Sequence, residues 1–229
     1  MASKARKAFD ENMVDVENLI QYYEFADESF REAAIEPPPG ADVVLRSAIV
    51  LLVTYWEAYI EDIVSEGVAH LVEHVPDPNN LPKELLKAIA RELKTDKNEI
   101  AIWRLASDGW RELLTQRLPG FRERRNRSFN TPKSDQTRQF VCEALGISDI
   151  TLCWKIDKDE PAQTCKVLDK VVELRGQIAH RGKLSKTVKP EVVRSMTEWF
   201  KKLVSKTGGH INSFIKKSCG VPLWETTSK

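Results

Sequence analysis

The stretch Ile49-Val-Leu-Leu-Val-Thr-Tyr-Trp-Glu-Ala-Tyr-Ile60 is apolar on nearly every side when it is read as a helix. A helix without a polar face is normally buried in a protein core. The sequence therefore predicts a long helix over roughly 41–75 that forms the buried hub of a bundle. Proline-rich segments lie at both ends, Glu36–Gly40 before it and Pro76–Asn80 after it. Because proline removes a donor and disfavours the helical conformation of the preceding residue, we expect these segments to be turns between helices.

Helical periodicity continues on both sides of this hub. Residues 10–35 place apolar side chains at three- and four-residue steps. We expect further helices at 82–94, 98–117, 134–145, 160–181 and 190–217, with a loop at 118–133. The last helix is expected to break at Gly208-Gly209. Since no segment shows the sustained alternation of a strand, the sequence predicts an all-α fold: an up-and-down helical bundle with additional short helices.

The length of 229 residues and the composition, 41% hydrophobic and 30% charged, are typical of one soluble globular domain. We expect a single domain over residues 1–229, divided into an acidic N-terminal helix at 1–36, the bundle at 41–217 and a flexible tail at 218–229. The longest apolar run, Ala48–Val53, is much shorter than the ~20 residues that span a bilayer. Four cysteines without CxxC spacing and an N-terminus without a signal peptide favour a cytoplasmic protein with free thiols and no membrane association.

The net charge of +1 hides an uneven distribution of charged side chains. Residues 10–36 carry nine acidic side chains and one basic, whereas residues 117–133 and 170–189 each carry six basic and one acidic. Local fields of this kind influence which partners a protein binds. The two basic regions are therefore the places to look for a nucleic-acid partner.

The sequence Arg175-Gly-Gln-Ile-Ala-His180 lies near the end of the helix expected at 160–181. The forked, permanently charged guanidinium of arginine suits a phosphate group. Histidine is the side chain best suited to proton transfer near neutral pH. Arg175 and His180 are therefore candidate catalytic residues for cutting RNA without a metal or a cofactor, with His180 moving protons and Arg175 holding the phosphate.

The same helix has two apolar faces when residues are placed about 100° apart. One stripe, the expected core face, contains Val167, Val171, Leu174 and Ile178. A second, narrower face contains Leu168, Val172, Gly176 and Ala179. The small side chains of Gly176 and Ala179, flanked by Arg175 and His180, let another backbone approach closely, which favours a symmetric homodimer through the 168–180 helix. The alternative, equally consistent with the sequence, is that helices of the same chain cover both faces.

Two other groups of residues are candidates for supporting roles. The run Phe121–Phe129 is either an RNA-binding loop or a solvated loop, and its RNA-binding candidates are Arg122, Arg124, Arg125 and Arg127. Glu57 lies on the apolar hub helix, where a carboxylate usually needs a partner. The alternatives for Glu57 are a bidentate contact that orients Arg175, a contact with another basic residue, or exposure to water.

Other chemistries have weaker support. His70 and His74 lie on one helix face with Glu66, but a histidine pair without companion ligands is more often an ordinary pair at a helix end, so we expect no metal site. The cysteines have no neighbouring base. The chain has neither a GxxxxGK[ST] nor a GxGxxG phosphate loop, which argues against a nucleoside-triphosphate motor or a dinucleotide enzyme.

Three stretches of the chain resemble the HEPN superfamily and, within it, the RiboL-PSP-HEPN group. The superfamily signature is an Arg, four to six intervening residues and a His at the end of a helix, and Arg175 and His180 match it with four intervening. Trp56–Asp62 resembles the aromatic-Glu pattern of the group's early helix. Asn130–Pro132, leading to Ala144–Ile147, resembles its middle segment.

The resemblance covers roughly residues 41–217 and implies an all-α bundle that dimerises along the motif helix. It also implies a metal-independent endoribonuclease in which the ribose 2′-hydroxyl attacks the adjacent phosphate and leaves a 2′,3′-cyclic phosphate, with His180 as acid/base and Arg175 as phosphate clamp. Related domains often serve as toxins or anti-phage defence effectors, which implies a neutralising or regulatory protein partner. Many active members have Asn directly after the Arg, where this chain has Gly176. Some members are silent binding modules.

From these residues we expect a homodimeric endoribonuclease whose site combines Arg175 and His180 of both chains. Gly176 and Gln177 would support the site, while Arg181 and Lys183 would guide the RNA. The alternatives are a catalytically silent module that binds RNA, a nucleotide or a protein, and a helical adaptor in which the motif is incidental. The acidic N-terminal helix is expected to pack as a brake on a basic surface of the same or another subunit.

Overall fold

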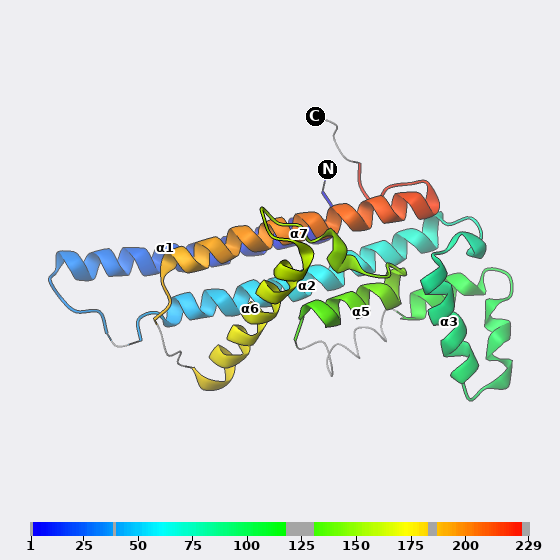
Figure 1. The fold of residues 1–229 in the computed structure, drawn as a ribbon, viewed down its shortest axis with the longest axis horizontal. Helices are drawn as coiled ribbons and strands as arrows, with labels where there is room; N and C mark the ends of the chain where they lie inside the picture. Colours follow the sequence, from blue (N-terminus) through cyan, green and yellow to red (C-terminus); the bar gives the residue numbers. More distant parts are fainter. Residues whose placement is uncertain (1, 39, 118–130, 183–186, 226–229) are drawn as a thin grey trace.

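A computed structural model describes residues 2–38, 40–117, 131–182 and 187–225 of the chain. Its long helices are α1 (Lys4–Glu32), α2 (Val43–His74), α3 (Lys83–Thr95), α5 (Ser134–Leu145), α6 (Pro161–Arg181) and α7 (Pro190–Cys219). Short 3-10 turns form η1 (Pro78–Asn80), η2 (Glu99–Leu105) and η3 (Ile150–Cys153). The described ranges contain helices and no strand, which confirms the predicted all-α fold (Figure 1).

Helix α2 is the hub that its sequence predicts. Its buried side chains cover somewhat more than half of its circumference, and α1, α5, α6 and α7 each pack against it. One side, which carries Ser47, Thr54 and Asp62, stays exposed. Figure 1 shows α1, α2 and α7 along the long axis of the molecule, with α6 crossing α2 obliquely. By length and composition alone α2 would also suit a membrane span, but in this fold its apolar residues form the core of the bundle.

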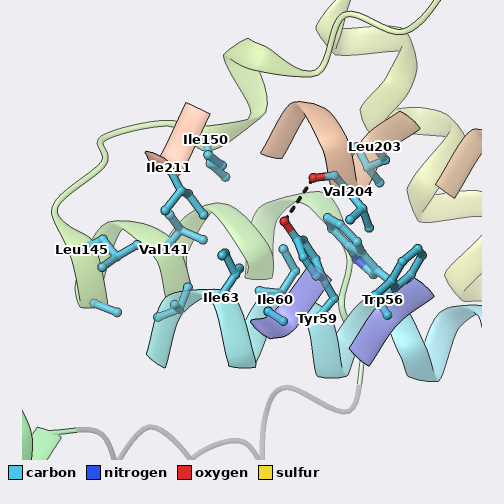
Figure 2. Close-up of a cluster of buried hydrophobic side chains, with 14 of the residues drawn as sticks. Trp56, Tyr59, Ile60, Ile63, Val141, Leu145, Ile150, Leu203, Val204 and Ile211 are labelled. Carbon is cyan, nitrogen blue, oxygen red and sulfur yellow. Dashed lines mark hydrogen bonds between the residues drawn. The ribbon is translucent and has the colours of Figure 1, made fainter. Parts of the chain in front are cut away.

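The polar groups of two core aromatic residues of α2, Trp56 and Tyr59, find partners on distant segments. The Trp56 indole N–H donates to the Pro132 carbonyl oxygen at 3.3 Å. The Tyr59 hydroxyl donates to the Val204 carbonyl oxygen at 3.1 Å (Figure 2), and burial raises the pKa of Tyr59, so that this donor stays protonated. A buried donor without a partner would cost about 1–3 kcal/mol. These bonds therefore fix how α2 sits against α7 and against the segment before α5.

The acidic helix α1 packs against α2 and α7 of its own chain. Its inner face buries Ala5, Phe9, Met13, Val16 and Ile20. Two of its carboxylates meet cations of α7: Glu17 lies 3.0 Å from Lys201, and Glu24 lies 2.5 Å from Arg194. Because α1 supplies core side chains, it is a structural part of the bundle, and removing residues 1–36 would expose that core.

The region 98–117 is not the single helix that the sequence suggests. Turn η2 ends at Leu105, and a separate helical stretch begins at Gly109 and is described to Arg117. A Cβ on Gly109 would lie 2.0 Å from the Arg104 carbonyl oxygen. The tight turn between the two pieces therefore requires a glycine, a constraint that helical periodicity does not reveal.

Helix α7 runs unbroken through Gly208-Gly209, so the expected break is wrong. Gly208 faces the core, where a Cβ would lie 2.5 Å from the Tyr59 hydroxyl oxygen, whereas a Cβ on Gly209 would meet nothing within 4 Å. The first glycine allows α7 to approach α2 closely. Tertiary packing thus overrides the low helix propensity of the pair.

The expected flexible tail at 218–229 is anchored over its first part. Gly220 ends α7 in the left-handed conformation, with φ of 81°. The Asn212 side chain donates to the Trp224 carbonyl oxygen at 3.0 Å and accepts from the Trp224 N–H at 3.1 Å. Residues 226–229 lie outside the described residues.

We predict opposite effects for alanine at the two neighbouring glycines. Gly208→Ala should lower the free energy of unfolding by about 1–3 kcal/mol, because the new methyl overlaps the Tyr59 hydroxyl. Gly209→Ala should raise it by about 0.5–1 kcal/mol, because an open helical site gains helix propensity. Urea unfolding of both variants measures the difference. The packing account requires that Tyr59→Phe, which removes the overlapping oxygen, partly rescues Gly208→Ala, and equal effects at both glycines would refute it.

Candidate active site at the end of helix α6

Helix α6 carries the Arg175–His180 motif away from the bundle. It begins with Pro161 in the first turn and ends at Arg181. Gly182 stops it with φ of 67°, a conformation that favours glycine, and its N–H donates to the Ile178 carbonyl oxygen at 2.9 Å. Figure 1 shows α6 crossing α2 and its last turns leaving the bundle. His180 therefore lies in the last turn of a projecting helix end.

The buried face of α6 differs from the expected core stripe. Its buried residues are Thr164, Leu168, Val171, Val172 and Ile178. Leu168 and Val172, which the sequence placed on a second face, are fully covered by the same chain, whereas Val167 and Leu174 are only half-buried. The periodicity located the apolar residues but not the direction from which α2 approaches them. The alternative of a face covered by the same chain is therefore correct for these two residues.

The remaining part of that second face is open. Gly176 is half-buried, a Cβ on it would meet nothing within 4 Å, and Ala179 is exposed. We call Gly176, Ala179 and His180 the open face of α6. Its small side chains lie where the helix leaves the bundle, so no neighbouring element in the described part of the chain crowds Gly176.

Arg175 lies at the border between the buried face and the open face. Its side chain is 21% exposed, and its Nη2 lies 3.4 Å from Oε2 of Glu57, whose side chain is 18% exposed. The expected partnership of Glu57 with Arg175 is thus present, but through one long contact and not in a bidentate manner. Nε of Arg175 is buried without a hydrogen-bond partner among the described residues. The guanidinium is held in place by α2 while part of it still reaches the surface.

His180 is exposed on the projecting end of α6. Five residues at about 100° and 1.5 Å each put it about 140° around the helix axis from Arg175 and about 7.5 Å along it. The two side chains of one chain therefore diverge. A phosphate that touches both an arginine and a histidine of this kind is better served by residues of two helices than by residues of one.

The other predicted site residues are distributed as follows. Gln177 and Arg181 are exposed on α6. The arginine-rich loop with Arg122, Arg124, Arg125 and Arg127 lies outside the described residues, as does Lys183.

Two contacts that the sequence did not suggest fasten α6 to the start of α5. The Asp169 carboxylate accepts from the Ser134 N–H at 2.8 Å and from its hydroxyl at 3.0 Å. Lys133 lies 2.7 Å from Glu173. Helix α5 has no side-chain cap from its own N-cap residue, so Asp169 caps it from α6. An aspartate facing a serine 35 residues away leaves no local pattern in the sequence.

The side chains of His70, His74 and Glu66 all contact backbone groups near helix ends. His70 Nε2 lies 3.1 Å from the Val221 carbonyl oxygen, and His74 Nδ1 lies 3.1 Å from the His70 carbonyl oxygen. Glu66 accepts from the backbone N–H groups of Lys4 and Ala5 at the start of α1. Among the described residues, no three ligand-type side chains converge as a metal site would require.

The cysteine thiols are poor candidates for nucleophiles. Burial raises the pKa of Cys142 and Cys165, and it raises the pKa of Cys153 to about 12. Because the thiolate is the reactive form, these three side chains are held in the unreactive state at neutral pH.

The comparisons with known proteins agree with the resemblance in the sequence. The model of the family described as RiboL-PSP-HEPN matches residues 12–213, which include α2, α5, α6 and most of α7. No curated protein and no solved structure matches the chain. A domain of this family suggests a nuclease-like or RNA-related function.

We predict that Asp169→Ala lowers the free energy of unfolding by about 1–2 kcal/mol, because the start of α5 loses its cap and the Ser134 N–H loses its partner. Glu173→Ala is the matched control, since it removes only an exposed ion pair and should change the free energy by less than about 1 kcal/mol. Urea unfolding of the two variants provides the test. Equal stability of both would show that Asp169 does not cap α5.

Proposed function

We propose, on the premise that this chain belongs to the RiboL-PSP-HEPN family, that it is a metal-independent endoribonuclease whose site lies at the end of α6. The observation that carries the proposal is the setting of its two motif residues. Arg175 is half-buried and oriented by Glu57, while His180 stands exposed about one and a half helical turns beyond it. A fixed cation and an accessible acid/base, brought together here from two chains, are what a phosphate-cleaving site needs.

The proposed reaction is attack of the ribose 2′-hydroxyl on the adjacent phosphorus. A bond forms between the 2′-oxygen and phosphorus, and the bond from phosphorus to the 5′-oxygen breaks. One His180 accepts the proton of the 2′-hydroxyl, and a second His180 donates a proton to the leaving 5′-oxygen. Arg175 stabilises the negative charge on the phosphate in the transition state. The products carry a 2′,3′-cyclic phosphate and a 5′-hydroxyl.

A homodimer through the open face of α6 is part of this proposal. Arg175 and His180 of one chain point about 140° apart, so two chains are needed to bring several of these side chains around one phosphate. The open face offers Gly176 and Ala179, which would allow close approach of a second helix. A symmetric pair would also supply the two histidines that the reaction uses.

A catalytically silent RNA-binding module is the second candidate. The observation in its favour is Gly176, which leaves the position after Arg175 without a polar side chain. In that case the open face would still form a dimer, and RNA would bind without being cut.

We predict that His180→Ala lowers the rate of RNA cleavage by at least about 100-fold, since general acid–base catalysis typically contributes 10²–10⁴-fold. The measurement uses labelled single-stranded RNA and total tRNA in EDTA, with chemical identification of the product ends. His210→Ala, at a half-buried histidine of α7, is the control. Cleavage by His180→Ala at the parental rate would refute the assignment, while a folded, dimeric parent that binds RNA without cutting it would select the silent module.

We predict that Gly176→Trp shifts the protein from dimer to monomer, whereas Gly176→Ala leaves the dimer intact. A Cβ at this position meets nothing within 4 Å in one chain, and the position lies where α6 leaves the bundle, so we expect both variants to fold. Only the large ring would obstruct a second helix on the open face. Sedimentation velocity measures the oligomeric state, and Gly209→Trp on α7 is the control. A Gly176→Trp protein that remains a dimer would place the interface elsewhere.

A further inference from the structure

The outward side of α6 carries a line of polar side chains that leads to His180. Lys166, Lys170, Gln177 and Arg181 are all exposed. At about 100° per residue they fall within about 60° of one another, opposite the buried face. We call these four residues the α6 ladder. At 1.5 Å per residue the ladder is about 22 Å long, and His180 lies beside its last member.

The positive charge of this line is not cancelled by the acidic residues of the same helix. Glu173 is paired with Lys133, and the Asp169 carboxylate faces Ser134 of α5, so one uncompensated carboxylate stands against the three cations Lys166, Lys170 and Arg181. In the described part of the chain, no ion pair joins Lys166 or Lys170 to a carboxylate. Elsewhere, lysines of α3 and α7 are paired, as Lys87 is with Glu84 and Lys202 with Asp157. The α6 ladder therefore keeps a net positive field.

We infer that the α6 ladder binds the backbone of single-stranded RNA next to the phosphate that is cut, with Lys166 and Lys170 as additional phosphate contacts. This inference rests on the proposed function. A single row of three cations and one amide side chain matches one phosphate backbone, whereas a duplex presents two. The ladder ends beside the acid/base residue, so a strand bound along it enters the site at His180. It lies on a different side of the helix from the open face, so dimerisation leaves it accessible.

The test compares Lys166→Gln/Lys170→Gln with Lys216→Gln/Lys217→Gln. Both double variants remove two exposed lysines, and Lys216 and Lys217 lie in the last turn of α7, far from the end of α6 (Figure 1). Binding of a labelled oligouridine is measured against salt concentration in the His180→Ala background, which prevents cleavage. A polyglutamate peptide serves as a second probe for an acidic protein partner.

The ladder variant should bind oligouridine about tenfold more weakly at moderate salt, and the slope of log affinity against log salt should fall by about 1.4, which is 0.7 for each lost phosphate contact. The α7 variant should match the parent. In the active protein the ladder variant should raise KM and leave kcat unchanged. Unchanged affinity and slope, or an equal loss in both variants, would overturn the inference even if His180 proves catalytic. Weakened binding of polyglutamate alone would assign the ladder to a protein partner and also overturn it.

Discussion

The burial of α2 against four other helices is the constraint on which this fold depends. A helix with so wide an apolar surface must be covered by other elements, and α1, α5, α6 and α7 cover it on every side except the one that carries Ser47, Thr54 and Asp62. The two aromatic side chains at its centre, Trp56 and Tyr59, satisfy their polar atoms on Pro132 and Val204, far away in the chain. Their hydrogen bonds turn a non-directional apolar contact into one defined arrangement, because a different packing would leave buried donors unpaired.

The helices and most of their ends were predictable from the sequence because prolines and glycines mark the turns, as Gly182 does for α6. What the sequence left open depends on contacts between distant segments. Periodicity found the apolar residues of α6 but could not tell that α2 covers Leu168 and Val172. Local propensity suggested a break at Gly208, where close packing against Tyr59 requires a glycine. Glu57 was a reasonable partner for Arg175, but the single 3.4 Å contact follows only from how α6 crosses α2.

The surface of helix α6 has three sides with different surroundings. Its inner side is buried, its small-residue side is open, and its outer side carries cations. Arg175 lies at the border of the first two, where Glu57 limits its motion and water still reaches part of it. A guanidinium in that position has less solvation to lose when it meets a phosphate, and fewer rotamers to give up, than one on a free surface. The division of the helix surface is thus a physical reason for the position of the motif.

Because the last turns of α6 leave the bundle, the activity of the protein would depend on how many copies a cell contains. If a second copy completes the site, the amount of working site at low abundance grows with the square of the number of chains, since two must meet for each pair. A cell that holds few copies would then contain an almost inert pool, and a modest burst of synthesis would produce a much larger rise in RNA damage. Dimerisation at the open face beside Gly176 would then set a copy number below which few active sites form, without a dedicated inhibitor.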